Sequence, residues 1–383
     1  MELSLRKTSK IFELKINPKI TKSILLNNNP KIMVKRIVAI IALAGSSYAH
    51  AQDSAAVNSG LKISGWSDVY YRYNFADSIN NYTSFTNSQN SFELGMISLK
   101  AEHSFGKVGV VGDLGFGKRA EEFSYNDDNT QLAIKQLYIT YSPAPNFKLT
   151  AGSWATHMSY EVVDAPVNRN YSTSYMFTYG PFFHTGIKGE LTVGKSSFML
   201  GLANPTDLKS ANFSKKYLVG QYSVAFANDK AKIYLNAHAG KASAASKNNQ
   251  FEIITTATVS DKFNLAYHTT LASYRDDPAS SWENYWGMAL YLNYDPVSSF
   301  GLTLRTEYLQ DNKAILPPLS APFTGIPGGN IIATTLSGNI RLNGLTFIPE
   351  FRLENASKEI FYKNSGAGTK TSATALIAAV YKF

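Results

Sequence analysis

Apolar and polar residues alternate along several long stretches of the chain. From Leu61 to Phe75 the odd positions are mostly apolar, whereas the even positions include Lys62 and Arg72. The same alternation recurs in three further stretches, at 183–193, 300–308 and 345–354. Successive side chains of a strand point to opposite faces, so a period of two over this length predicts β-strands.

These stretches are longer than the strands of most soluble domains, which run about five or six residues. They run about ten to fourteen residues, a length that crosses a bilayer at a tilt. A Lys or Arg at the bilayer midplane costs about 2 to 4 kcal/mol, so the charged face is expected to meet water and the apolar face lipid. Pro349 interrupts one stretch and cannot donate to the ladder, so a local bulge is expected there.

Short turn signals alternate with longer polar segments along the whole chain. The short turns fall at 104–107, 142–146, 194–197, 228–230, 260–262, 295–299 and 342–344. The long segments fall at 76–90, 117–131, 157–181, 204–214, 240–249, 273–283, 310–329 and 355–370. This order predicts an all-β protein, an up-and-down antiparallel transmembrane β-barrel of about 16 strands with both termini at the short turns. Counts of 14 or 18 stay open, since boundaries read from one sequence err by about two to four residues.

The N-terminal region has the pattern of a secretory signal. Lys35 and Arg36 precede an apolar run, and Ala49-His50-Ala51 matches a small-residue cleavage site. We expect residues 33–51 to be a signal peptide, 1–32 an upstream extension from an over-long translation start, 52–60 a short periplasmic segment and 61–383 the barrel.

Composition supports an exported protein and argues against nucleic-acid binding. The chain has no cysteine, which excludes a disulfide framework. Its formal net charge is +9, but residues 1–51 hold nine basic and two acidic residues, so only +2 remains beyond them. The basic excess that would suggest a nucleic-acid partner lies in the segment expected to be removed.

Aromatic residues gather at the expected strand ends. The sequence ends on Phe383, the last residue of an alternating stretch, and such an ending resembles the signal read by the barrel-insertion machinery. Other aromatic residues are expected to form a girdle at the two membrane interfaces. They are Tyr71, Tyr73, Phe75, Tyr291, Tyr294 and Tyr381.

Two segments resemble a known family. They are SFELGMISLKAEHSFGKVGVVGDLGFGKRAEEFSYND (91–127) and TAGSWATHMSYEVVDAPVNRNYSTSYMFTYGPFFHTG (150–186). They resemble the putative β-barrel porin-2, OmpL-like family, and the resemblance runs from about Leu61 to Phe383. It implies an outer-membrane barrel with a pore and brings no catalytic or ligand residues with it.

Several motifs suggest chemistry but lack the required context. Gly189–Ser196 matches the P-loop expression, yet it reads as an alternating strand and a tight turn rather than a strand, a loop and a helix. The six histidines show no metal-binding spacing and read as isolated lumen residues. His157, Ser159 and Asp164 are close in sequence, which by itself is no evidence of a catalytic triad.

The charged face supplies the candidate pore lining. These residues are Lys62, Asp68, Arg72, Lys188, Glu190, Arg305, Glu307, Glu350, Arg352 and Glu354. Their balanced signs predict weak ion selectivity, although neighbouring opposite charges could also simply pair across strands. The third long loop carries Glu161, Asp164 and Arg169, which could set opposed charges across a constriction if the loop folds inward; an ordinary surface loop is the alternative.

The sequence therefore predicts an outer-membrane porin for passive diffusion of small hydrophilic solutes, not an enzyme, without cofactor or metal. Sixteen strands enclose an interior too wide for side chains to fill. Its expected partners are outer-membrane lipid, the insertion machinery and, as an open question, further copies of itself. The alternatives are a barrel with a blocked lumen that acts as an enzyme or as a surface adhesion protein.

Overall fold

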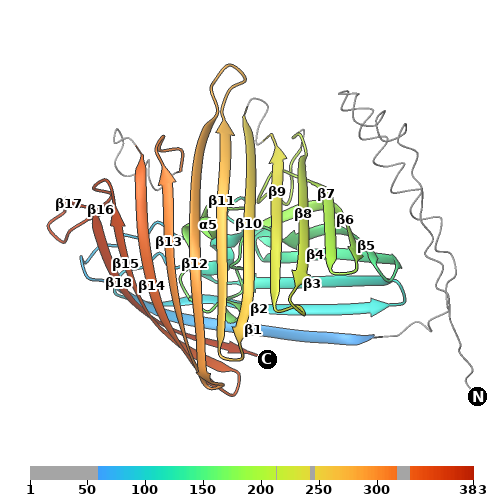
Figure 1. Cartoon of the computed structure of the whole chain (residues 1–383), viewed down its shortest axis with the longest axis horizontal. Helices are drawn as coiled ribbons and strands as arrows, with labels where there is room; N and C mark the ends of the chain where they lie inside the picture. The colour runs from blue at the N-terminus through green and yellow to red at the C-terminus, as the bar shows by residue number, and fades with distance from the viewer. Residues whose placement is uncertain (1–58, 213, 242–245, 317–327) are drawn as a thin grey trace, which may run out of the picture. The chain divides into compact units, whose positions relative to one another are not determined.

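Sixteen antiparallel strands close into one barrel in the computed structural model, in which residues 59–212, 214–241, 246–316 and 328–383 are described (Figure 1). This confirms the predicted fold class and strand count. The expected signal peptide (33–51), the upstream extension (1–32) and nearly all of segment 52–60 lie outside the described residues. Among the residues that are described, no helix is long and apolar enough to cross a membrane.

The barrel strands follow one another around the ring in chain order. They are β1 (Ser59–Asn74), β2 (Ser91–Phe105), β3 (Val108–Phe116), β4 (Ile134–Ala144), β5 (Phe147–Ala155), β6 (Phe183–Val193), β7 (Ser196–Ala203), β8 (Tyr217–Phe226), β9 (Ala231–Gly240), β10 (Lys247–Ser260), β11 (Phe263–Arg275), β12 (Glu283–Val297), β13 (Phe300–Asp311), β14 (Gly329–Leu342), β15 (Leu345–Ala356) and β18 (Thr371–Lys382).

The remaining elements lie in the long loops. They are α3 (Lys118–Phe123), α4 (Asn129–Leu132), the 3₁₀ turn η1 (Ala165–Val167), α5 (Tyr175–Thr178) and the small hairpin β16 (Phe361–Tyr362) with β17 (Gly368–Thr369). The predicted short turns and long loops all occur where the strands end. The short turns share one end of the barrel, which in outer-membrane barrels is the periplasmic end.

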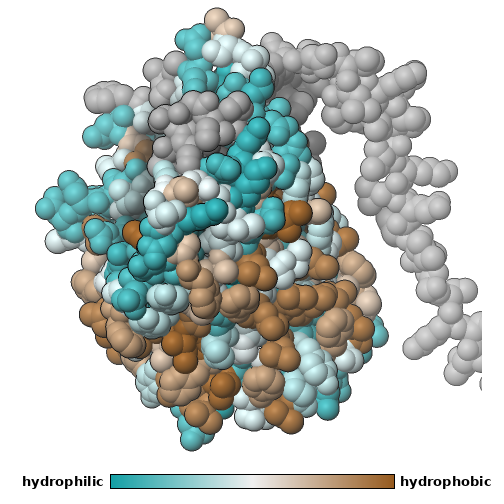
Figure 2. Space-filling view, turned by 90° about the vertical axis from the view of Figure 1, so that its left-hand side faces the viewer, coloured by the Kyte–Doolittle hydropathy of each residue, from teal (hydrophilic) through white to brown (hydrophobic). Residues whose placement is uncertain are grey.

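Residue alternation in the sequence becomes an inside and an outside in the barrel. Val69 on β1 is 46% exposed on the outer wall, whereas its neighbour Asp68 is 3% exposed inside. Figure 2 shows hydrophobic residues gathered over the barrel wall and hydrophilic residues toward the long loops. This is the surface expected of a barrel whose wall faces lipid.

The first and last strands close the ring. β1 pairs with β18 from Trp66 opposite Lys382 to Asn74 opposite Thr374. Beyond this register, the backbone of Phe383 exchanges two hydrogen bonds with Gly65, at 3.0 and 3.1 Å. The terminal aromatic residue therefore belongs to the ladder, and no edge strand is left open to lipid.

Pro349 does not cause the bulge that the sequence predicts. β14 and β15 keep one register on both sides of it, with Ser337 opposite Glu350 and Ile340 opposite Phe347. The proline ring lies against Gly338, where an added Cβ would stand 3.4 Å from the ring. A glycine opposite the ring leaves it room, so the strand stays straight without an extra residue.

The prediction that Tyr291 belongs to an aromatic girdle is wrong. Tyr294 is 45% exposed on the outer wall, but Tyr291 is 2% exposed and faces the lumen, where its ring lies 4.4 Å from that of Tyr160. An odd spacing of three residues in a strand puts the two tyrosines on opposite faces. At the other end, Tyr71 and Phe75 do face outward and contact Phe92 and Phe351.

We predict that Leu290→Arg lowers the free energy of unfolding of the refolded barrel by about 2 to 4 kcal/mol. Leu290 is 43% exposed on the outer wall near the middle of β12, where an arginine would have to enter lipid. Urea unfolding in lipid vesicles measures the change. The control is Ser223→Arg on the inner face of β8, which should change stability far less; equal losses in both variants would contradict the assigned faces.

Candidate pore and the loop inside it

The third long loop, residues 156–182, folds into the barrel. Its helix α5 contacts β11, β12 and β13, and η1 contacts β18. Tyr171, Tyr175, Met176 and Phe177 from this loop are at most 1% exposed. The lumen on the side of β12–β15, β18 and β1 is therefore filled by the loop.

Carboxylates of the wall accept the buried backbone N–H groups of this loop. Glu350 on β15 accepts from Tyr171 at 2.9 Å and from Ser172 at 3.3 Å. Glu307 on β13 accepts from the backbone of Tyr175 at 2.7 Å. Since a buried unpaired N–H is costly, these carboxylates fix where the loop can lie.

Arg305 on β13 binds the same loop with a positive charge, opposite to that of the carboxylates. Its guanidinium, fully buried, donates to the carbonyl of Ser172 at 2.7 Å and to Glu161 at 2.6 Å. It also lies 3.2 Å from Glu307, which in turn pairs with Arg352 at 2.7 Å. Each buried charge has an opposite charge in contact, which is the condition for keeping ions inside a protein.

Two tyrosines of the loop complete its attachment. Tyr171 donates its hydroxyl to Asp68 on β1, and Tyr175 donates to Glu354 on β15, at 2.6 and 2.7 Å. Burial raises the pKa of both phenols well above the usual value, so both stay protonated as donors. The loop is thus tied to strands on both sides of the barrel closure.

The three candidate constriction residues are all ion-paired to the wall. Glu161 pairs with Arg305 on β13, Asp164 with Lys135 on β4 at 2.6 Å, and Arg169 with Asp295 on β12 at 2.7 Å. The loop therefore crosses the lumen between β4 and β13. Asp164 and Arg169 keep 30% and 25% of their side chains exposed, whereas Glu161 keeps 4%.

The candidate pore-lining residues divide into two groups in the structure. Seven point inward but are covered by loops at 6% exposure or less: Asp68, Arg72, Arg305, Glu307, Glu350, Arg352 and Glu354. Lys62, Lys188 and Glu190 remain in contact with water at the short-turn end. Alternation could place all ten on one face, but it could not say which of them a loop would cover.

Two cavities remain along the opposite wall. One, of about 730 Å³, opens toward the long loops and is lined by residues that include Glu122, Phe182 and His238. The other, of about 270 Å³, lies toward the short turns and is lined by residues that include Lys148 and Gln221. The two cavities lie toward opposite ends of the barrel and share no lining residue.

A single layer of side chains separates these cavities at β8 and β9. We call the cavity near the short turns the inner cavity and the one near the long loops the outer cavity. Gln221, which lines the inner cavity, donates to Asn236 at 2.8 Å and to the carbonyl of His157 at 3.3 Å. Asn236 is fully buried, and the next inward residue of β9 is His238 in the outer cavity. The amide groups of Gln221 and Asn236 and the backbone carbonyl of His157 therefore lie between the two cavities.

His157, His184 and His268 are not isolated, contrary to the sequence prediction. The rings of His157 and His184 lie 5.1 Å apart, and His268 lies 3.4 Å from Glu252. His157 comes from the loop and His184 from β6, so only the inward fold of the loop brings them together. Within the described ranges, no group of three or more potential ligands is placed to hold a metal ion.

The catalytic arrangements considered from sequence do not assemble. The ring of His157 approaches the carbonyl of Ala237, the backbone of Ser159 binds Glu252, and Asp164 pairs with Lys135. Gly189–Ser196 forms the end of β6, a tight turn and the start of β7. These residues have structural roles in the barrel.

Other charged residues of the lumen were missed in the sequence. Lys100, Lys148 and Lys232 all lie on the inner face at the short-turn end, and Arg341 pairs there with Asp295 at 2.8 Å. The signal was available in part. Extending the alternation through every strand, rather than through the clearest ones, would have placed them on the same face.

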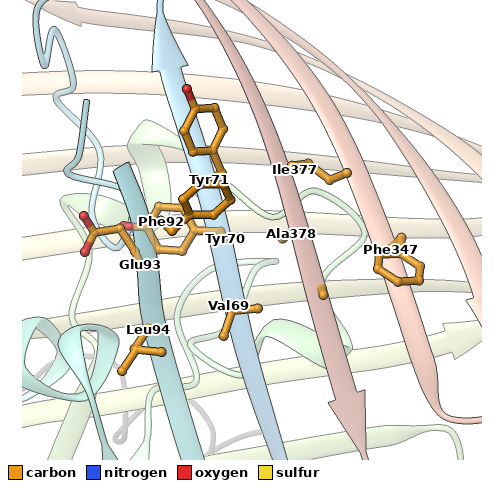
Figure 3. A pocket seen from close by; sticks show the side chains of 10 residues that line it. Val69, Tyr70, Tyr71, Phe92, Glu93, Leu94, Phe347, Ile377 and Ala378 are labelled. Atoms are coloured by element: carbon orange, nitrogen blue, oxygen red, sulfur yellow. The ribbon is translucent and has the colours of Figure 1, made fainter. Parts of the chain in front are cut away.

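An apolar groove on the outer wall is unrelated to these cavities. It has a volume of about 310 Å³ and lies over β2, β1, β18 and β15. Figure 3 shows Val69, Leu94 and Ile377 among its side chains. These residues belong to the lipid-facing set, so the groove is no part of the solute path.

A 16-stranded barrel with a long loop folded into its lumen agrees with the family comparison. The model of the putative β-barrel porin-2, OmpL-like family matches residues 60–383. The chain belongs to this family. The porin is an outer-membrane channel for passive diffusion, as the sequence predicts.

Solved structures of outer-membrane channels share the fold. OmpT of Vibrio cholerae is 10% identical, with a TM-score of 0.55 over 84% of this porin and 97% of that chain. DcaP of Acinetobacter baumannii is 11% identical, with 0.57 over 84% and 97%. The anion-selective porin of Comamonas acidovorans is 10% identical, with 0.58 over 84% and 99%. No curated protein sequence matches the porin.

We predict that Arg305→Met destabilises the folded porin by about 3 to 5 kcal/mol, because it leaves Glu161 buried without its partner and Glu307 with Arg352 alone. Urea unfolding in lipid vesicles gives the value. The control is Lys195→Met, since the pair of Lys195 and Asp229 is 62% and 56% exposed. An exposed pair contributes less than about 1 kcal/mol, and a loss in this control as large as in Arg305→Met would refute the role of the buried network.

Proposed function

We propose that small hydrophilic solutes diffuse through this porin along the wall formed by β5–β10, beside the third long loop, and that this loop sets the size limit. Glu161, Asp164 and Arg169 hold the loop across the lumen in this proposal. The observation that supports this proposal most is the pair of cavities of about 730 and 270 Å³, with Gln221 and Asn236 lying between them.

The filled half of the lumen supports this route. Arg305, Glu307 and Glu350 are at most 6% exposed under the loop, so water and solutes reach little of that wall. The inward residues beyond the separating layer, among them Lys148, Lys188 and Glu190, keep side-chain exposures between 14% and 48%. A layer of amide side chains between two cavities is suited to discriminating by size.

The proposal includes a non-enzymatic role, which the separate partners of His157, Ser159 and Asp164 support. The residues that could have formed a catalytic triad bind different partners, and the polar groups of the loop hold it in place. The proposal needs neither cofactor nor energy coupling.

The proposal also covers processing and assembly. Cleavage near Ala51 would release a mature chain that begins at Gln52, and N-terminal sequencing of the membrane form tests this. A homo-oligomer is favoured by one structural neighbour, the in-vitro folded OmpT of Vibrio cholerae, described as a trimer form. The apolar groove over β1, β2 and β18 offers such a contact, which cross-linking in membranes would detect.

Planar-bilayer recordings of the refolded chain Gln52–Phe383 test the pore itself. We expect stepwise ohmic openings and, in vesicle swelling, a sharp size limit for uncharged sugars. A folded barrel, confirmed by heat-modifiable gel mobility, that neither conducts nor admits sugars would overturn the proposal in favour of an enzyme or adhesion role.

Gln221→Ala is predicted to raise the unitary conductance by roughly a tenth to a half, because it removes the side chain that bridges β9 and the loop at the separating layer. The control is Gln310→Ala on the outer wall of β13, where the same truncation leaves the lumen unchanged. If both variants conduct like the parent protein, the narrowest point lies elsewhere.

A further inference from the structure

We infer that this porin favours small anions over cations, and that the lysines and arginines on the inner face of its short-turn half and in its third loop produce this preference. The inference rests on the proposed route and goes beyond the weak selectivity that the balanced sequence set predicts. The difference arises because the sequence set omits several basic residues of the inner face, and because loops cover some charges of the lumen and leave others in water.

The charges that remain in water are mainly basic. We count the inward-facing residues of the short-turn half together with those of the third loop. The basic ones are Lys62, Lys100, Lys148, Arg169, Lys188, Lys232, Arg341 and Lys382, and the acidic ones are Glu102, Asp164, Glu190 and Asp295. The loops cover four acidic and three basic residues of the predicted set, so the basic excess comes mainly from inward residues that the sequence analysis did not include, such as Lys100, Lys148 and Lys232.

Every acidic residue of this exposed set is already paired with a cation. Glu190 lies 3.1 Å from Lys148 and 3.5 Å from Lys188. The others pair as Glu102 with Lys100, Asp164 with Lys135, and Asp295 with Arg169 and Arg341. Each acidic residue of this set thus has at least one basic partner, and Glu190 and Asp295 have two each.

Three lysines of this set form no ion pair with another residue of the described ranges. They are Lys62 on β1, Lys232 on β9 and Lys382 on β18, and all three are exposed. They lie on the inner face near the periplasmic mouth. A cavity lined by one sign of charge with low-dielectric walls raises the local concentration of the opposite ion.

A basic side chain also lies near the layer of Gln221 and Asn236. The ammonium of Lys188 lies 5.3 Å from the ring of Trp154, which is inward on β5 beside His184. The acidic group near this depth, Glu252, is fully buried and accepts hydrogen bonds from the Ser159 backbone, Gln250 and Thr270. A solute at the layer therefore meets the cation and not the carboxylate.

The test is the reversal potential of the refolded porin across a gradient of KCl. We expect chloride to be more permeant than potassium, with a preference that weakens at high salt as screening grows. The double variant Lys62→Gln/Lys232→Gln breaks no ion pair and should lower the permeability ratio roughly twofold. Lys188→Gln should lower it further.

The control is Lys195→Gln, which removes a lysine from an exposed turn, where it pairs with Asp229, and should leave the ratio unchanged. Conductance with equal or greater permeability of potassium would overturn this inference and leave the pore intact. If the lysine variants leave the permeability ratio unchanged, these lysines do not produce the preference for anions. Absence of any conductance would instead refute the proposed function.

Discussion

The burial of a loop inside a barrel depends on finding hydrogen-bond partners for its backbone. The third loop of this porin finds them in wall carboxylates. Glu350 and Glu307 accept the N–H groups of Tyr171, Ser172 and Tyr175, and Arg305 donates to the carbonyl of Ser172. Without this match the buried amides would cost more than the apolar packing of the loop could return.

The proposed route and its charge follow from that attachment. Because the loop occupies the lumen next to β12–β15, the proposed route runs along β5–β10, past the amide groups of Gln221 and Asn236. The same attachment buries wall charges of both signs, and the charges left in water are mainly basic. One structural requirement, satisfying a buried backbone, thus influences both the place of the proposed route and its electrostatics.

The wall meets a different constraint. A strand in lipid has no water to bond its backbone, so each strand must pair with a neighbour on both edges. The pairing of β1 with β18 closes the ring. The pairing extends to Phe383, whose backbone bonds Gly65. Pro349 is tolerated because Gly338 leaves space for its ring, so the register of β14 and β15 continues.

The sequence by itself determined the barrel. Period-two alternation, strand length and the order of short and long connections are local properties, and they predicted sixteen strands and the inner face that carries Asp68 and Arg305. It could not determine which inner residues stay in water, because that depends on contacts between segments far apart in the chain. The pairs of Glu161 with Arg305 and of Asp164 with Lys135, and the contact of His157 with His184, exist only once the loop is inside. Alternation assigns a residue to a face; only tertiary packing decides whether that face is open or covered.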